Sequence, residues 1–356
     1  MVCSNASIIG GWPLGRLIAQ LLVVPALNYD LAALEPLIGQ GIGGVLLLGS
    51  TPAPGDLGTL VASTVAGAPD HLRPFVMADE EGGGIQRLAG LVASFPWPRQ
   101  IAQTMTAAQT QALGDTVGEQ MSRAGINMDL APVLDVDGRV GPNASNPDGS
   151  RSFSADPAIA ARYGAAFMKG LDQGGVTSVV KHFPGLGGAT GNTDNGPAAT
   201  LPLAALRLGG LLPFRATIAA GAPAVMVSNA TVPGLTSTPA SLSPAVIAGL
   251  LRGELGFTGL VITDSLSAGA ISQAGYSLPQ AVVASLHAGA DMILFGSTIT
   301  PAETALLDPT TITTTVSQVE AAVATAVTTR QVHRSTLELA VEKILSTKHA
   351  DLCSNA

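Results

Sequence analysis

Charged and aromatic side chains are scarce in this chain of 356 residues. Lys and Arg number only 17, they form no basic cluster, and the formal net charge is −8. Binding to a nucleic acid backbone requires a basic face, so the composition excludes nucleic acid as an expected partner. Aromatic residues make up 4% of the chain, which argues against a long stacking platform for a polymer.

Long apolar segments are missing as well. The longest uncharged stretch lies between Arg215 and Arg252, and prolines and Asn229 interrupt it. No run of about 18 uninterrupted apolar residues exists that could span a membrane. Hydrophobic residues nevertheless make up 47% of the chain, which is enough for a large core and too much for a disordered protein. We therefore expect a globular protein without a transmembrane segment.

Cysteine is nearly absent, and the two that occur, Cys3 and Cys353, lie at opposite ends of the chain. The termini of one domain are often close together, so a disulfide between them is one reading and two free thiols are the other. A disulfide would indicate an oxidising, extracytoplasmic compartment, whereas free thiols would fit the cytoplasm. Residues 1–7 have neither the basic nor the apolar region of a signal peptide, so an extracytoplasmic location would imply a signal outside this sequence.

Eight short runs rich in Val, Ile and Leu recur along the chain, with segments of helical spacing between them. Strands that alternate with helices pair in parallel through right-handed crossovers, and buried parallel strands read as continuous apolar runs. Eight such units predict a (β/α)₈ barrel. The runs occupy residues 21–26, 43–48, 75–79, 126–133, 176–182, 224–229, 259–264 and 291–295.

The helical segments place the whole chain in one domain. A helix over 12–20 should cap the bottom of the barrel, and one or two helices over 311–347 should pack outside it. Two α/β halves would be the alternative, but no Pro/Ser-rich linker divides the chain. We predict a single domain over 1–356 with its barrel core near 17–300. Helices between the strands are expected over 31–40, 56–65, 101–124, 157–173, 203–220, 243–255 and 278–287.

Polar residues gather where the predicted strands end. Asp79, Asp135, Lys181, His182 and Asp264 follow four different apolar runs. One charged residue after a strand is usually the start of a solvated loop, but a barrel carries its active site on the carboxyl face of the strands. Since charged residues are only 12% of the chain, this grouping predicts a functional site at that face.

Asp264 could be a metal ligand, a general base or a nucleophile in glycosyl transfer. The five histidines have no ligand-type spacing, and no second carboxylate or His lies near Asp264 in the sequence. A Gly-rich stretch at 185–188 lacks the dinucleotide and Walker signatures. We therefore expect neither a metal ion nor an organic cofactor.

Several polar strand ends belong to longer motifs, such as Lys181-His182-Phe183-Pro184-Gly185 and Ala78-Asp79-Glu80-Glu81-Gly82-Gly83. Five such motifs, in their order along the chain, resemble glycoside hydrolase family 3. The resemblance is closest to its single-domain branch of β-N-acetylhexosaminidases acting on peptidoglycan fragments, and it extends from about residue 17 to 291. It implies the same (β/α)₈ fold. The motifs are Lys181-His182-Phe183-Pro184-Gly185 with Gly187, Ala78-Asp79-Glu80-Glu81-Gly82-Gly83 with Gln86-Arg87, Gly125-Ile126-Asn127 with Ala131-Pro132-Val133-Leu134-Asp135-Val136, Asp148-Gly149-Ser150-Arg151-Ser152-Phe153 and Gly256-Phe257-Thr258-Gly259-Leu260-Val261-Ile262-Thr263-Asp264.

The resemblance also implies roles for individual residues. Asp264 matches the nucleophile that forms the covalent glycosyl-enzyme. Arg, Lys and carboxylate groups can hold sugar hydroxyls without aromatic stacking, which agrees with the low aromatic content. The residues that match sugar-binding positions are Asp79, Arg87, Arg151, Lys181 and His182.

The sequence departs from the family at the acid/base loop. The family's Asp-Ser-His triplet, in which His is the acid/base, corresponds here to Asn192-Thr193-Asp194. Leu186 also replaces a His of the signature, and Gly84 replaces an Arg. A Gly/Asn/Asp-rich loop is by itself an ordinary turn-forming segment, so the functional interpretation of Asp194 rests on its position.

Three interpretations of this loop stay open. In the first, Asp194 is itself the acid/base, because retaining glycosidases ordinarily use two carboxylates roughly 5 Å apart. In the second, the protein is a catalytically silent sugar-binding or envelope homologue, and in the third another residue supplies the acid. Our hypothesis is a retaining exo-hydrolase of terminal β-linked N-acetylglucosamine from cell-wall glycans, with a β-glucosidase as the second enzyme alternative. The expected partner is a small carbohydrate or muropeptide, and we expect a monomer.

Overall fold

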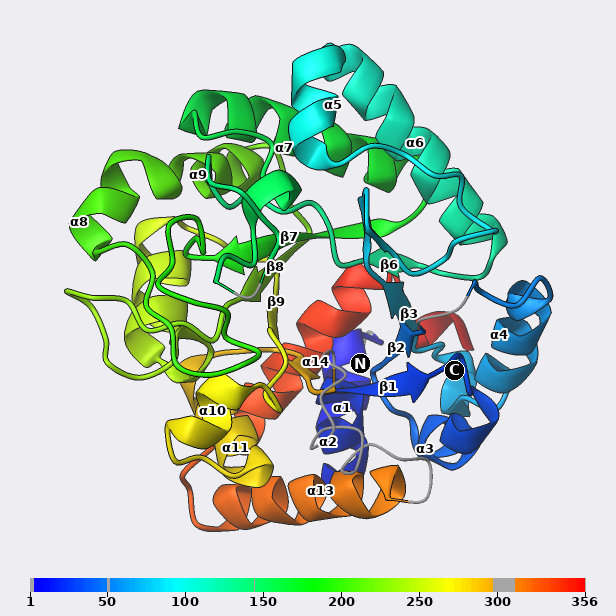
Figure 1. Cartoon of the computed structure of the whole chain (residues 1–356). Coiled ribbons are helices and arrows are strands. Elements are labelled where there is room, and N and C mark those ends of the chain that lie inside the picture. Colours follow the sequence, from blue (N-terminus) through cyan, green and yellow to red (C-terminus); the bar gives the residue numbers. More distant parts are fainter. Residues whose placement is uncertain (1–2, 50–51, 144, 297–310, 356) are drawn as a thin grey trace.

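Eight parallel strands form the barrel at the centre of the molecule (Figure 1). The structure is a computed structural model that describes residues 3–49, 52–143, 145–296 and 311–355. The strand order is β10-β1-β2-β3-β6-β7-β8-β9, and a parallel bridge between Ile262 and Met292 joins the two ends of this series. The predicted (β/α)₈ fold is thus confirmed. The strands are β1 Leu22–Leu27, β2 Gly44–Leu48, β3 Phe75–Ala78, β6 Met128–Asp129, β7 Thr177–Phe183, β8 Ala224–Val227, β9 Leu260–Thr263 and β10 Ile293–Leu294.

Apolar side chains fill the inside of the barrel, and the surroundings of Gly44 show how closely the strands pack. A Cβ on Gly44 would lie 2.7 Å from the Met77 side chain and 3.4 Å from that of Met292, so β2 approaches its neighbours where only glycine leaves room. The strand expected over 126–133 is regularly paired only at Met128–Asp129, because Pro132 has no N–H for the ladder.

The segment expected as one helix over 101–124 forms two helices, α5 Pro98–Thr104 and α6 Ala107–Arg123. Met105 between them is extended, and Thr106 caps α6. Its hydroxyl accepts from the N–H of Gln109 at 3.2 Å, while the Gln109 side chain accepts from the N–H of Thr106 at 2.8 Å. This reciprocal capping box begins a new helix, which is why the expected single helix was wrong.

The segment expected as a helix over 203–220 is likewise interrupted. It consists of α8 Leu203–Ala205, the π-helical η4 Leu206–Gly210 and α9 Leu212–Ala219. Pro213 in the first turn of α9 has no N–H with which to continue the preceding turn. The remaining elements around the barrel agree with the expected helices: η1 Ala32–Leu34 with α3 Glu35–Gln40, α4 Leu57–Val65, α7 Pro157–Gln173, the π-helical η6 Ala245–Glu254, and α11 Leu278–Ala288.

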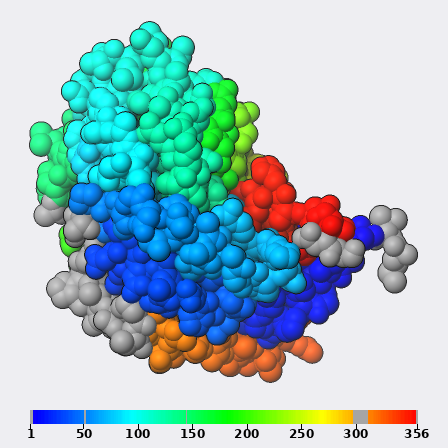
Figure 2. All heavy atoms as spheres, turned by 90° about the vertical axis from the view of Figure 1, so that its right-hand side faces the viewer, coloured from blue at the N-terminus to red at the C-terminus, as the bar shows by residue number. Residues whose placement is uncertain are grey.

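Both ends of the chain meet on one side of the molecule (Figure 2). Cys3 and Cys353 form a disulfide with their Cα atoms 5.9 Å apart, which decides between the two readings of the sequence. The terminal elements are the expected leading helix α2 Leu14–Leu21, preceded by α1 Asn5–Gly10, and the outer helices α13 Ile312–Thr328 and α14 Arg334–Thr347. None of the described helices is both long and apolar enough to cross a membrane.

Candidate active site

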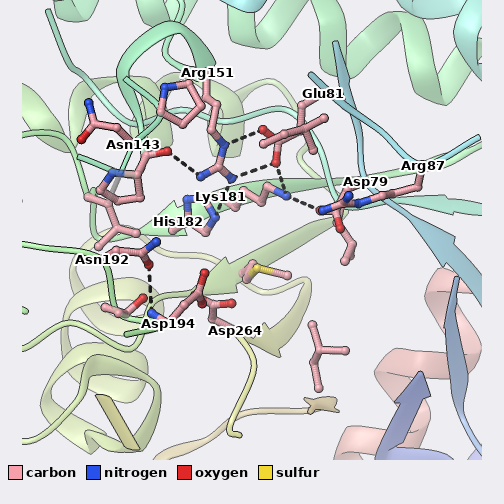
Figure 3. A pocket seen from close by; sticks show the side chains of 18 residues that line it. Asp79, Glu81, Arg87, Asn143, Arg151, Lys181, His182, Asn192, Asp194 and Asp264 are labelled. Carbon is pink, nitrogen blue, oxygen red and sulfur yellow. Dashed lines mark hydrogen bonds and ion pairs between the residues drawn. The ribbon is translucent and has the colours of Figure 1, made fainter. Parts of the chain in front are cut away.

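A cavity of about 360 Å³ opens where the strands end at their carboxyl side (Figure 3). Its walls come from the segments that follow β3, β6, β7 and β9, as the barrel fold requires. Every site residue predicted from the sequence lines this one cavity. They are Asp79, Arg87, Arg151, Lys181, His182, Asn192, Thr193, Asp194 and Asp264.

Glu81 organises the cationic wall of the cavity. It lies on the short strand β4 Glu80–Gly82, which pairs with β5 Ile85–Gln86 directly after β3. Its carboxylate accepts from Nε and Nη2 of Arg151 at 2.7 and 2.8 Å, and it lies 2.7 Å from Nζ of Lys181. Burial alone would raise the pKa of Glu81, but these two cations together hold it well below its usual range. Glu81 is therefore ionised and fixes both cations.

Lys181 also contacts Asp79, with Nζ 2.6 Å from Oδ1. Burial would lower the pKa of Lys181, but Asp79 and Glu81 raise it, so the ammonium group stays charged. The main-chain N–H of Arg87 donates to the carbonyl of Asp79 at 3.2 Å. Its side-chain Nε is buried without a hydrogen-bond partner among the described residues, so Arg87 has a donor left for a ligand.

His182 is held by Asp135 in a defined orientation. Its Nδ1 lies 2.7 Å from Oδ2 of Asp135, and its Nε2 lies 3.5 Å from Nη2 of Arg151. Burial, reinforced by Arg151 and Lys181, lowers the pKa of His182 to about 4. The imidazole is therefore neutral at pH 7. Since Asp135 takes the hydrogen of Nδ1, Nε2 is an acceptor for a hydroxyl group.

Asp264 and Asp194 reach the cavity from different parts of the chain, and their side chains lie next to each other in Figure 3. Asp264 follows β9, and the N–H of Ser265 donates to its Oδ1 at 2.7 Å. Burial raises the pKa of Asp264, and the charge of Asp194 raises it further, while His182 opposes the shift. The repulsion between these two neighbouring carboxylates thus contributes to the raised pKa of Asp264.

The family model of the glycosyl hydrolase family 3 N-terminal domain matches residues 14–346. The chain belongs to glycosyl hydrolase family 3. It is thus an O-glycosyl hydrolase by family, as the motifs predicted.

Relatives of this family 3 enzyme cover most of its length. Beta-hexosaminidase LpqI of Mycobacterium tuberculosis is 38% identical over 293 residues, covering 79% of this chain and 72% of the relative. A beta-hexosaminidase of Stenotrophomonas maltophilia is 35% identical over 243 residues, covering 66% of this chain and 70% of that protein. The crystal structure of a beta-N-acetylhexosaminidase from Beutenbergia cavernae has a TM-score of 0.82 at 30% identity, covering 95% and 99% of the two chains.

The loop of Asn192, Thr193 and Asp194 in the family 3 enzyme is docked onto the segment after Asp264. The N–H of Gly269 donates to the carbonyl of Asp194, and the N–H of Ala270 donates to that of Thr193, both at 2.9 Å. Within the loop, Oδ1 of Asn192 accepts from the N–H of Asp194 at 2.9 Å. Asn192 therefore sets the turn that carries Asp194.

For three residues of the site, the sequence did not predict a role in binding a ligand or in positioning other side chains. Glu81 stood in a quoted motif beside Glu80, and only the pairing of β4 decides which of the two faces the cavity. Asp135 was noted at a strand end and Asp148 begins the motif that contains Arg151, but the sequence assigned a role to neither. Leu186, which replaces the family's His, lines the cavity and packs on Ala189 and Ala230.

Proposed function

We propose that this family 3 enzyme hydrolyses terminal β-linked N-acetylglucosamine with retention at the anomeric carbon. The observation that carries the proposal is that Asp264 and Asp194 line one cavity together with the cluster of Glu81, Lys181 and Arg151. Two carboxyl groups in one site supply the nucleophile and the acid/base of a retaining mechanism. The choice of sugar is supported by relatives that are named beta-hexosaminidases.

Asp264 serves as the nucleophile in this mechanism. Its carboxyl follows the rigid strand β9, and the N–H of Ser265 fixes one of its oxygens at 2.7 Å. The other oxygen attacks the anomeric carbon, and the glycosidic bond breaks as the ester with the sugar forms. Placement on a strand end keeps the carboxylate in position for this attack.

Asp194 serves as the acid/base. It donates its proton to the departing oxygen and then accepts a proton from the water that cleaves the glycosyl-enzyme. The repulsion between the two carboxylates favours a single proton on the pair, which the acid needs at the start of the reaction. After proton donation, the negative charge of Asp194 would repel phosphate, so water is the expected acceptor.

The sugar is held by groups of both signs. Arg87 and the cations fixed by Glu81 donate to hydroxyl oxygens, whereas Asp79 and Nε2 of His182 accept from hydroxyl groups. These are hydrogen-bonding contacts that need no aromatic platform.

The test uses an aryl β-N-acetylglucosaminide as substrate. Asp264→Ala and Asp194→Ala should each lower kcat by about 10²-fold or more, with azide restoring product release. Azide should give the β-glycosyl azide with Asp194→Ala and the α-glycosyl azide with Asp264→Ala, because only the first variant still forms the covalent intermediate. Asp137→Asn, which changes a buried acid outside the cavity, is the matched control.

Other outcomes would support the alternatives. Binding of N-acetylglucosamine without turnover of any aryl glycoside would favour the silent homologue. Faster turnover of the aryl β-glucoside would favour a β-glucosidase. Full activity of Asp194→Ala would place the acid elsewhere.

We further propose that the substrate comes from cell-wall glycans and that the enzyme acts outside the cytoplasm. The disulfide between Cys3 and Cys353 supports this location, since such bonds persist in oxidising compartments. Release of N-acetylglucosamine from purified muropeptides is the test of the substrate.

A further inference from the structure

Asp148 is a buried acid next to the sugar-binding groups, and it has no part in the proposed mechanism. It is 0% exposed and directly precedes the turn η3 Gly149–Arg151, which carries Arg151 into the cavity. Neither oxygen of its carboxyl group accepts a hydrogen bond from a donor among the described residues. A buried carboxylate without a donor is very costly, so the chemical state of this group requires an explanation.

The immediate neighbours of Asp148 are Asp135 and His182. One carboxyl oxygen of each acid and a ring nitrogen of His182 all lie within 4.8 Å of one another. Asp135 is itself fully buried and accepts from Nδ1 of His182 at 2.7 Å and from the N–H of Leu186 at 2.6 Å. It is therefore stabilised as a carboxylate.

Among the described residues, the arginine whose charge acts on Asp148 is already paired. It is Arg151, whose Nε and Nη2 are bound to Glu81 and whose Nη1 donates to the carbonyl of Pro147 at 3.0 Å. Two buried carboxylates side by side cannot both be ionised when the nearby charge is already paired. A protonated Asp148, in contrast, has a donor for Asp135.

We propose that Asp148 is a positioning residue that remains protonated at neutral pH, donates to Asp135, and so keeps His182 with its hydrogen on Nδ1 and its Nε2 as an acceptor that faces the cavity. The chain of contacts runs from Asp148 through Asp135 to His182, which lines the cavity. The sugar contact at its end rests on the proposed function, but the protonation of Asp148 and the tautomer of His182 do not.

The charges around Asp148 agree with this state. Burial raises its pKa well above the usual range, and the charge of Asp135 raises it further. Arg151 and His182 oppose the shift, and Asp137 adds to it. Burial raises the pKa of Asp135 to about 6, and the hydrogen bonds from Leu186, His182 and Asp148 oppose this rise, so Asp135 stays ionised at neutral pH. Asp148 and Asp135 thus share one proton.

Asp148→Asn tests the proposal, because its amide has the shape of the protonated acid and can also donate to Asp135. An acid that is protonated in the folded state and ionised in the unfolded state makes stability fall as pH rises above about 4, the unfolded pKa. Replacing it with Asn removes this loss. The Tm of the variant should therefore equal or exceed that of the wild type, and the difference should grow from pH 4 to pH 8.

Asp137→Asn is the matched control. Asp137 is also buried but pairs with Arg139 at 3.1 Å, and although burial would raise its pKa, the hydrogen bonds of Arg139 keep it below the usual range. Its replacement should lower the Tm near neutral pH, and this loss should shrink as pH falls. A destabilised Asp148→Asn that behaves like this control would overturn the proposal.

The state of His182 supplies a readout that does not depend on activity. Nitrogen-15 NMR of the imidazole should give the Nδ1–H tautomer in the wild type and in Asp148→Asn, and a mixture of tautomers in Asp148→Val. KM for the aryl substrate should rise with Asp148→Val and return with Asp148→Asn. If the protein shows the Nδ1–H tautomer of His182 but does not turn over the aryl substrate, the proposed function is refuted and the role of Asp148 is not.

A bound cation is the competing explanation for three such groups in one place. In that case a chelator would lower the Tm of the wild-type protein, and Asp148→Asn would remove this sensitivity. Either result would overturn the proposal, whereas a Tm unaffected by chelator supports it.

Discussion

Glu81 and Arg151 form a two-pronged ion pair at the wall of the cavity, with distances of 2.7 Å from Nε and 2.8 Å from Nη2. The same carboxylate contacts Lys181, so one acid from β4 holds two cations that come from η3 and β7. Because the pair is buried, its geometry fixes how the cations are presented to a ligand.

Glu81→Gln should therefore lose both sugar affinity and stability. Leaving Arg151 and Lys181 without their shared carboxylate is expected to cost about 3–5 kcal/mol of unfolding free energy and to raise KM. The control is Glu80→Gln, because Glu80 forms no ion pair within the described part of the chain and burial raises its pKa to about 7. Urea denaturation and kinetics measure the two effects, and equal losses for both variants would contradict this account.

Asn192→Ala should lower kcat more than it raises KM. The side chain of Asn192 holds the turn that carries Asp194 but makes none of the ion-pair contacts of the sugar-binding wall. Misplacing a catalytic group by about 1 Å costs up to about 100-fold in rate. Asn192→Asp, which keeps the acceptor oxygen, should restore kcat. Exposed Asn195 provides the control, and a rise in KM alone would show that Asn192 acts on sugar binding.

The stability of the protein should depend on pH through Lys348. Burial, with a smaller contribution from Arg16, lowers its pKa to about 7, whereas the unfolded value is about 10.4. The folded state then binds fewer protons between these values, so Lys348 makes stability rise from pH 7 to pH 10. In Lys348→Met this rise should disappear. Thermal denaturation checks it against Lys169→Met, at an exposed position, and parallel curves for wild type and Lys348→Met would refute the assignment.

Reduction of the disulfide between Cys3 and Cys353 should lower the Tm without changing the kinetics. The bond links residues 350 positions apart, and a crosslink of a long loop typically contributes about 2–4 kcal/mol. Neither cysteine lines the cavity. A double Cys→Ser variant should have the same Tm as the reduced protein, and reductant should not change that Tm. A wild-type Tm that reductant leaves unchanged would contradict the prediction.

Much of this architecture was readable in the sequence. The periodic apolar runs predicted eight parallel strands, since a strand buried on both faces must be apolar throughout. The scarcity of charge made the polar residues at strand ends conspicuous, and Asp79, Lys181, His182 and Asp264 do line one cavity. The errors concern local breaks, such as the capping box at Thr106, where side-chain hydrogen bonds outweigh helical periodicity.

By itself, the sequence determined the barrel, the face that carries the site, and the family, because periodicity and ordered motifs are local properties of the chain. Tertiary structure alone decided that Glu81 rather than Glu80 holds the cations, that Asp148 lies against Asp135, and that Asp194 lies beside Asp264. These relationships depend on burial and on charges brought together from distant segments. The ionisation of a carboxyl group responds to that environment and not to its neighbours along the chain.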